Sequence, residues 1–217
     1  MLRANDTPSM TRLAKFCACV FATMLTACAT VPPFEPTAIE RKIISVSQWG
    51  GTPADATKAR LHTISRITLH HQGETFARGR DPQQYLRNLQ AWSRNTRKWL
   101  DIPYHYVIDF DGNIYQARDI RFAGDTNTEY DPAGHALIEV VGNFEEIEPN
   151  PLQLTAVANL MTMLAQKYSV PPDAIRGHRD YSTTTECPGK NLYRYLAEGY
   201  FHKRVRANLA SMNKFLN

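Results

Sequence analysis

The stretch Ile175-Arg-Gly-His178-Arg-Asp-Tyr-Ser-Thr-Thr-Thr185-Glu-Cys187-Pro-Gly189 places an imidazole and a thiol nine positions apart on a loop bounded by glycine and proline. Both groups are ligand types that zinc accepts in a tetrahedral site. A catalytic zinc site takes three protein ligands and leaves its fourth position to water. The stretch therefore predicts two zinc ligands, His178 and Cys187, and requires a third from elsewhere in the chain.

A strand-like run, Ile64 to His71, offers the third ligand because it ends in two adjacent histidines. Successive side chains of a strand point to opposite faces of a sheet. His71 then shares a face with Ile67 and Leu69. His70 lies on the opposite face, with the polar residues. We therefore predict that His70 binds the metal and that His71 packs against the apolar side.

Four separated motifs follow one another along the chain. They are the histidine that ends this run, then Pro103-Tyr-His-Tyr-Val-Ile-Asp-Phe-Asp-Gly-Asn-Ile-Tyr115, then Ile138-Glu-Val-Val-Gly-Asn-Phe144, and finally Gly177-His-Arg-Asp with Cys187-Pro-Gly. Together, from about Ile64 to Leu196, they resemble the zinc N-acetylmuramoyl-L-alanine amidases. That family includes the amidase-type phage lysozymes and the peptidoglycan recognition proteins. The resemblance implies an α/β fold with a central mixed sheet flanked by helices, and zinc in a surface groove.

Hydrophobic periodicity alone also predicts an α/β domain. Strand-like alternation covers four runs: 64–71, 104–110, 113–118 and 135–142. Asp111-Gly112 predicts a hairpin turn between the second and third runs. Asp81-Pro82 and Asn150-Pro151 each supply a helix N-cap and a proline at the first helical position. A last amphipathic helix begins near Gly199, and the aromatic residues after Pro82, including Trp92 and Trp99, are assigned to the core.

Residues 1–27 are predicted to be a secretory signal peptide. A basic stretch from Arg12 to Lys15 precedes an apolar stretch that is too short to span a bilayer in the usual way. Its end, Leu25-Thr-Ala-Cys28, resembles the lipobox of bacterial lipoproteins, which implies cleavage before Cys28, lipidation of its sulfur and a true start at Met10. The alternative is an uncleaved anchor or a short buried helix.

The resemblance to lipoproteins sets the predicted domain organisation. Residues 28–42 form a lipidated, proline-rich tether, and residues 43–217 form the zinc amidase domain with its C-terminal helix. Ala29 stands where an aspartate would favour inner-membrane retention, so we expect an outer-membrane anchor facing the periplasm if the host has two membranes. The expected partners are therefore peptidoglycan or muropeptides, and the membrane through Cys28; no protein partner is inferred.

Cysteine usage and charge narrow the function further. Cys187 is the only thiol left in the mature domain, and a lone thiol in an oxidising compartment is a liability unless something such as zinc occupies it. Removal of the signal peptide lowers the formal charge from +4 to +2, because three basic residues and one acidic residue leave with it. Nucleic acid is therefore not an expected partner.

The resemblance also implies three catalytic residues. Amide hydrolysis needs an activated water, stabilisation of the oxyanion and a proton for the leaving nitrogen. Tyr104 is implied to lie beside the zinc, and the Thr185 hydroxyl to hold the water or the oxyanion. Glu139 is the third candidate, because a carboxylate in an apolar strand is costly without a partner and bacterial members of the family use one as general base. The sequence leaves open whether Tyr104 or Glu139 takes the proton.

One segment departs from the family pattern. Many relatives carry Gly-x-His-Ala before Asn-x-x-Ser-Ile-Gly, whereas this chain has Ala123-Gly-Asp-Thr126 and then Asp131-Pro-Ala-Gly-His135. A groove histidine is therefore missing or replaced by His135, which leaves the fine substrate specificity open. His105 and Asp109 are assigned structural roles, and Tyr106 is assigned to packing.

Two function classes remain. The first is a zinc amidase that hydrolyses the bond between N-acetylmuramic acid and L-alanine in peptidoglycan or its fragments. The second is a non-catalytic peptidoglycan-binding module of the same fold. Binding-only relatives typically lose the cysteine, so Cys187 favours hydrolysis. A purely structural zinc site would need a fourth protein ligand, and the sequence offers no convincing one.

Overall fold

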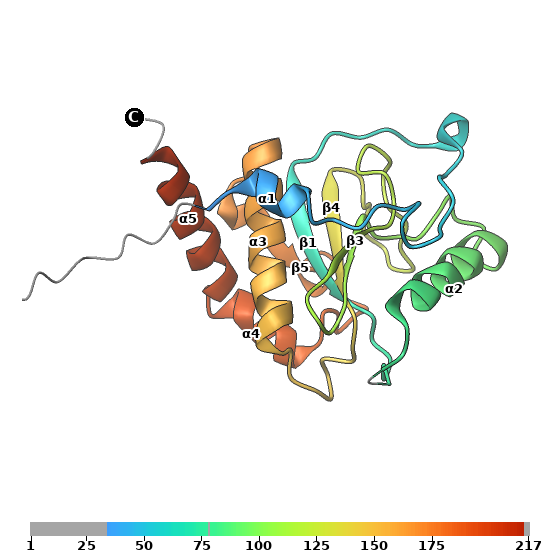
Figure 1. Ribbon diagram of the computed structural model, residues 1–217. Helices are drawn as coiled ribbons and strands as arrows, with labels where there is room; N and C mark the ends of the chain where they lie inside the picture. Colours follow the sequence, from blue (N-terminus) through green and yellow to red (C-terminus); the bar gives the residue numbers. More distant parts are fainter. Residues whose placement is uncertain (1–33, 78, 215–217) are drawn as a thin grey trace, which may run out of the picture. The chain divides into compact units, whose positions relative to one another are not determined.

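The computed structural model describes residues 34–77 and 79–214. Five strands form one mixed sheet in the order β3-β2-β4-β1-β5 (Figure 1). The strands are β1 (Arg66–His71), β2 (Tyr106–Ile108), β3 (Ile114–Gln116), β4 (His135–Val140) and β5 (Ile175–Gly177). Neighbouring strands are parallel except the β2–β3 hairpin. The predicted α/β fold with a central mixed sheet flanked by helices is confirmed.

Helix α3 (Pro151–Tyr168) covers one face of the sheet. The Asn150 side chain accepts hydrogen bonds from the backbone N–H groups of Leu152 and Gln153, and the Gln153 side chain accepts one from Asn150 N, which completes a capping box. Ser169, at φ +54°, ends the helix. The predicted start of this helix is confirmed.

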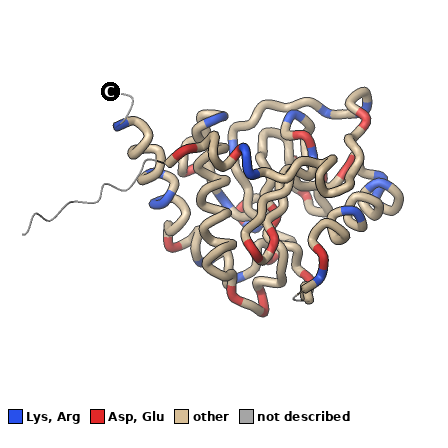
Figure 2. The backbone as a smooth tube through the Cα atoms, viewed as in Figure 1, with Lys and Arg blue, Asp and Glu red and all other residues tan. Residues whose placement is uncertain are grey.

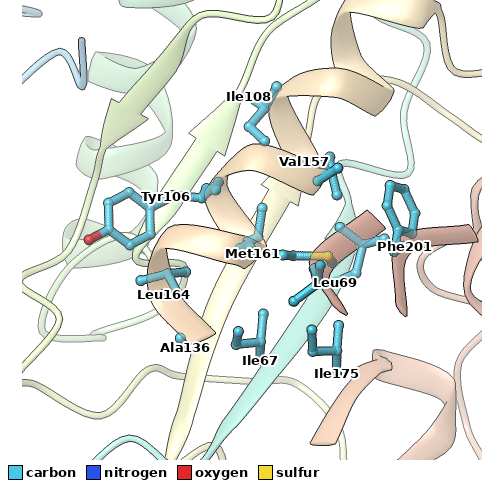
Figure 3. Close-up of a cluster of buried hydrophobic side chains, with 14 of the residues drawn as sticks. Ile67, Leu69, Tyr106, Ile108, Ala136, Val157, Met161, Leu164, Ile175 and Phe201 are labelled. Atoms are coloured by element: carbon cyan, nitrogen blue, oxygen red, sulfur yellow. The ribbon is translucent and has the colours of Figure 1, made fainter. Parts of the chain in front are cut away.

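The main hydrophobic core lies between α3 and this face of the sheet. Figure 3 shows Ile67 and Leu69 of β1 close to Val157 and Met161 of α3, with Phe201 alongside. All five side chains are fully buried. Two further helices, α4 (Lys190–Ala197) and α5 (Tyr200–Asn213), add to the same layer. The alternation predicted for β1 therefore holds, since its apolar residues face α3.

Helix α2 (Pro82–Asn95) packs on the opposite face of the sheet. The Asp81 side chain accepts a hydrogen bond from Gln83 N and caps the helix, as predicted. Tyr85 and Leu86 enter a second, smaller core with Val107 and Val141. This core covers only part of the second face, and the polar side chains of β1 lie beside it.

The structure corrects the predicted tether. Residues 36–40 form a short helix, α1 (Pro36–Glu40), and Ile39 packs against the main core. The Glu40 carboxylate contacts the Lys167 ammonium at 2.5 Å, and Phe34 N donates to the Ser211 hydroxyl at 3.4 Å. The folded domain therefore begins before Ile43.

Two elements differ from the sequence-based expectation, and one assignment was wrong. Strand β5 lies where the sequence predicted a loop; it was missed because it has only three residues and ends in glycine. Helix α4, which follows Cys187-Pro188-Gly189, was not predicted. The short 3-10 turns are η1 (Ala56–Lys58), η2 (Pro172–Ala174) and η3 (His178–Asp180). Trp92, assigned to the core, is 43% exposed because α2 covers the sheet with its other side.

The predictions for the N-terminal segment concern residues outside the described ranges. The signal peptide, Met10 and Cys28 lie outside the described residues. Within residues 34–77 and 79–214, no helix combines the length and apolarity needed to cross a bilayer. Basic and acidic residues are interspersed along the backbone in Figure 2.

Candidate metal centre and adjoining groove

Two parallel strands bring the predicted ligands together at their carboxyl ends. β1 and β5 are hydrogen-bonded neighbours, so these ends meet. His70 lies at the end of β1, His178 follows β5 directly, and Cys187 lies on the loop before α4. One nitrogen or sulfur atom from each of the three lies within 4.8 Å of the others. Sγ of Cys187 is 3.6 Å from Nδ1 of His70.

Backbone contacts hold the cysteine loop in place. Cys187 O accepts a hydrogen bond from Arg179 N at 2.8 Å, and His71 N donates to Cys187 Sγ at 3.4 Å. Gly189 has φ +83°, and a Cβ there would lie 2.6 Å from the carbonyl carbon of Phe144. Only glycine fits this close approach. The loop is therefore pressed against both β1 and the segment that follows β4.

His71 has the packing role that was predicted for it. Its ring stacks on Phe144 with the centroids 6.3 Å apart, and its Nδ1 accepts a hydrogen bond from Phe144 N at 3.2 Å. It is not a member of the ligand cluster. Alternation along β1 thus separates a candidate metal ligand, His70, from a packing residue, His71.

A threonine orients the second imidazole. Nε2 of His178 is hydrogen-bonded to the Thr128 hydroxyl at 2.8 Å, so Nδ1 is the nitrogen available to a metal. The rings of His70 and His178 are 4.6 Å apart. Burial lowers the pKa of His178 to about 4 and holds that of His70 well below its usual range. Both imidazoles are therefore neutral at physiological pH, the form that binds metals.

The donor set fits zinc. Two imidazole nitrogens and a thiolate are its preferred ligands, and bonds of about 2.0–2.3 Å in a tetrahedron separate the ligand atoms by roughly 3.3–3.8 Å. The 3.6 Å separation of Cys187 Sγ and His70 Nδ1 matches this range. Burial raises the pKa of the Cys187 thiol to about 12, so a metal must displace its proton. Among the described residues this is the one such cluster, and it has three members, as an open catalytic site requires.

Two adjoining hollows make a groove around this cluster. The first, of about 250 Å³, is lined by the three ligands together with Tyr104, Thr185 and Trp99. The second, of about 390 Å³, shares Tyr104 and Trp99 with the first and is also lined by Glu139. We call them the metal hollow and the side hollow. Tyr104 lies where they join.

Glu139 occupies the centre of the sheet beside the metal cluster. It is the register partner of His70 on β4 and is 2% exposed. Its Oε1 accepts a hydrogen bond from the Tyr85 hydroxyl at 3.0 Å, and its Oε2 has no partner among the described residues. Burial raises the pKa of this carboxyl to about 8, although the bond from Tyr85 opposes the shift.

The other two predicted catalytic residues, Tyr104 and Thr185, line the metal hollow. The Tyr104 ring lies 5.0 Å from that of His70. Burial, reinforced by Glu139, raises the pKa of this phenol well above its usual value, so it keeps its proton. The Thr185 hydroxyl oxygen accepts a hydrogen bond from Cys187 N at 3.1 Å, which leaves its own proton free to be donated.

His135 does not replace a groove histidine. It lies at the start of β4, paired with Arg66, whereas the metal cluster lies at the other end of the strands. The ring is buried beside Tyr181, and its Nδ1 is hydrogen-bonded to Thr68 Oγ1 at 2.7 Å. That alternative was therefore wrong, and Thr126 and Thr128 line the metal hollow instead.

The residues assigned structural roles have them. His105 is buried and bridges two backbone groups, Phe122 O and Leu137 N. Asp109 accepts hydrogen bonds from the turn of the β2–β3 hairpin and from the Tyr115 hydroxyl. Tyr106 packs in the main core.

Sequence reasoning missed three residues of the site. Thr128 lies in a polar segment without periodicity, and its contact with His178 joins positions 50 residues apart. Tyr85 was expected only to pack, since spacing gives no sign of where its hydroxyl points. Trp99 was assigned to the core but is half-buried and lines both hollows. The one available signal was its place just before the Pro103-Tyr104 motif.

Comparisons with known proteins agree with this architecture. A family profile described as N-acetylmuramoyl-L-alanine amidase matches residues 60–190. Peptidoglycan-recognition protein SD of Drosophila melanogaster is 31% identical over 161 residues, which cover 71% of this chain and 83% of the relative. Peptidoglycan recognition protein 1 of Mus musculus is 28% identical over 162 residues, covering 71% and 85%.

Solved structures give the same result. The crystal structure of Drosophila peptidoglycan recognition protein SD has a TM-score of 0.61 at 27% identity and covers 71% of this chain and 92% of that one. The complex of tracheal cytotoxin with the ectodomains of recognition proteins LCa and LCx has a TM-score of 0.63 at 26% identity, covering 71% and 93%. The chain therefore belongs to the N-acetylmuramoyl-L-alanine amidase family, together with the peptidoglycan recognition proteins.

Proposed function

We propose that this chain is a zinc-dependent N-acetylmuramoyl-L-alanine amidase. It hydrolyses the amide bond between the lactyl group of N-acetylmuramic acid and L-alanine in peptidoglycan or its fragments. The observation that carries the proposal is the convergence of His70, His178 and Cys187, with ligand atoms within 4.8 Å, beside a buried Glu139. Homologues bind peptidoglycan fragments such as tracheal cytotoxin, which supports the substrate class.

In this mechanism the metal supplies Lewis acidity, and side chains of the protein supply hydrogen-bond donors. Zinc, held by His70, His178 and Cys187, supplies Lewis acidity for the scissile carbonyl and for water. The Tyr104 phenol keeps its proton at neutral pH and lines the same hollow, so it donates a hydrogen bond to the developing oxyanion. The Thr185 hydroxyl is placed to act as a second donor.

Glu139 moves the proton in this mechanism. Its free Oε2 accepts a proton from the attacking water and delivers it to the departing alanine nitrogen. Burial, opposed by the hydrogen bond from Tyr85, raises its pKa to about 8, and a cation bound by the neighbouring His70 would favour the charged carboxylate. A pKa brought toward neutrality in this way suits a group that must both take and return a proton.

The proposal is tested by mass spectrometry of purified peptidoglycan and of soluble muropeptides after incubation with zinc-loaded protein. We expect free stem peptides with an L-alanine amino terminus. Their release should be lost with a chelator and with Cys187→Ser, and should fall to a low residual rate with Glu139→Gln. Glu148→Gln, which changes an exposed carboxylate paired with Arg194, is the matched control and keeps activity. Intact substrate that sediments with zinc-loaded wild-type protein would instead establish a binding module.

We also propose that the chain is exported through the signal peptide of residues 1–27 and anchored by lipid on Cys28. In a host with two membranes the anchor lies in the outer membrane and the domain faces the periplasm. The lipobox-like Leu25-Thr-Ala-Cys28 supports this location. Incorporation of a labelled fatty acid that is lost in Cys28→Ser would agree with it, and equal labelling of both proteins would contradict it.

A further inference from the structure

A buried tyrosine from α2 contacts the carboxyl of Glu139. The Tyr85 hydroxyl donates to Oε1 of Glu139 at 3.0 Å, across a sequence separation of 54 residues. Both side chains are buried, and both line the side hollow. This is the one hydrogen bond to the Glu139 carboxyl among the described residues, since Oε2 has no partner there. The rotation of the carboxyl is therefore set by Tyr85.

The tyrosine ring is fixed independently of its hydroxyl. It makes an edge contact with Phe76, with centroids 5.4 Å apart, and the Arg80 guanidinium lies 5.4 Å above it. Leu86 and Val107 belong to the same small core. Because packing holds the ring, its hydroxyl is a fixed donor, and the carboxyl must turn to meet it.

We propose that Tyr85 is a positioning residue for the amidase reaction. By occupying Oε1, it fixes the rotation of the Glu139 carboxyl and leaves Oε2 as the oxygen that takes and returns the proton. Tyr85 does not touch the substrate bond in this arrangement and acts only through Glu139. The inference rests on the proposed function and assigns a role to a helix outside the metal cluster.

The chain offers a matched control. Tyr115 donates to Asp109 Oδ2 at 2.9 Å, which is also a buried tyrosine–carboxylate bond, but it stabilises the β2–β3 hairpin and not the metal site. Tyr85→Phe and Tyr115→Phe each remove one such hydroxyl and keep the ring. If removal of such a hydroxyl lowered activity only by lowering the stability of the fold, both variants would lose activity to the same extent.

Kinetics in two backgrounds test the role. We expect Tyr85→Phe to lower kcat about tenfold or more, since acid–base catalysis contributes on the order of 10²–10⁴-fold, and to leave KM within about twofold. In the Glu139→Gln background the same change leaves the residual kcat within about twofold, because the group that Tyr85 positions is gone. Tyr115→Phe leaves kcat within about twofold of wild type. The inference would be overturned if Tyr85→Phe lowered kcat by the same factor in both backgrounds. It would also be overturned if Tyr115→Phe lowered kcat as much as Tyr85→Phe does.

A structural readout separates this inference from the proposed function. In crystal structures of wild type and Tyr85→Phe, we expect the aromatic ring at position 85 to stay in place while the Glu139 carboxyl rotates away from its wild-type position. An unmoved carboxyl would overturn the positioning role whatever the activity. If zinc-loaded wild type cleaves nothing, the proposed function fails, and the two structures still decide the positioning claim.

Discussion

Removing the Thr128 hydroxyl should weaken zinc binding measurably. With Nδ1 of His178 on the metal, Nε2 carries a proton and donates it to Thr128 Oγ1 at 2.8 Å. Thr128→Val leaves this partly buried N–H without a partner, which costs about 1–3 kcal/mol. Loss of such an outer contact typically lowers metal affinity about 10- to 100-fold, or about 1.4–2.7 kcal/mol. The two estimates agree.

The assay is competition for Zn²⁺ against a chromophoric chelator at fixed pH. Thr128→Ser keeps a hydroxyl and should stay within about threefold of wild type. Thr75→Val, at an exposed threonine near Glu146, is the control for threonine-to-valine substitution and should not change affinity. A Thr128→Val affinity within about twofold of wild type would refute the reasoning, because the ring would then be oriented by other contacts.

Three further predictions concern stability and loop order. Phe201→Ala empties a fully buried position in the main core and should lower the free energy of unfolding by about 3–5 kcal/mol, measured by urea denaturation. Gly124→Ala places a Cβ 2.6 Å from Pro103 O, so the backbone must shift and the melting temperature should fall. A glycine-to-alanine change at the surface should leave the melting temperature unchanged. Hydrogen bonds from its own backbone N–H and from residues 182–184 lower the pKa of Glu129 to about 2, so their contribution is complete above its ordinary pKa and is lost as pH falls toward 2. Hydrogen exchange at Thr183 N should therefore stay slow from pH 8 to 5 and become fast in Glu129→Ala; equal protection in that variant would contradict this.

The sequence predicted the candidate metal cluster because each of its three members follows from a local rule. Strand alternation separates His70 from His71, and the polar loop that holds His178 and Cys187 is bounded by glycine and proline. Both rules act over a few residues and do not depend on the rest of the fold. The structure brings together the three residues that these rules selected.

The remainder of the site depends on contacts between distant segments. Thr128 reaches His178 across 50 residues, and Tyr85 reaches Glu139 across 54, so neither contact leaves a periodic signal. Trp92 shows the limit of helical spacing. Its spacing predicts a core position, but α2 covers the sheet with its other side, and the ring stays exposed.

Hydrolysis in H₂¹⁸O tests the central claim most directly. Zinc-loaded protein is incubated with purified muropeptide, and both products are weighed by mass spectrometry. Amide hydrolysis adds the water oxygen to the acyl carbon and its proton to the nitrogen. We predict one ¹⁸O in the lactyl carboxylate of the muramic acid product and none in the stem peptide that begins with L-alanine. Substrate that stays intact with one equivalent of bound zinc, or ¹⁸O found in the peptide instead, would contradict the amidase assignment.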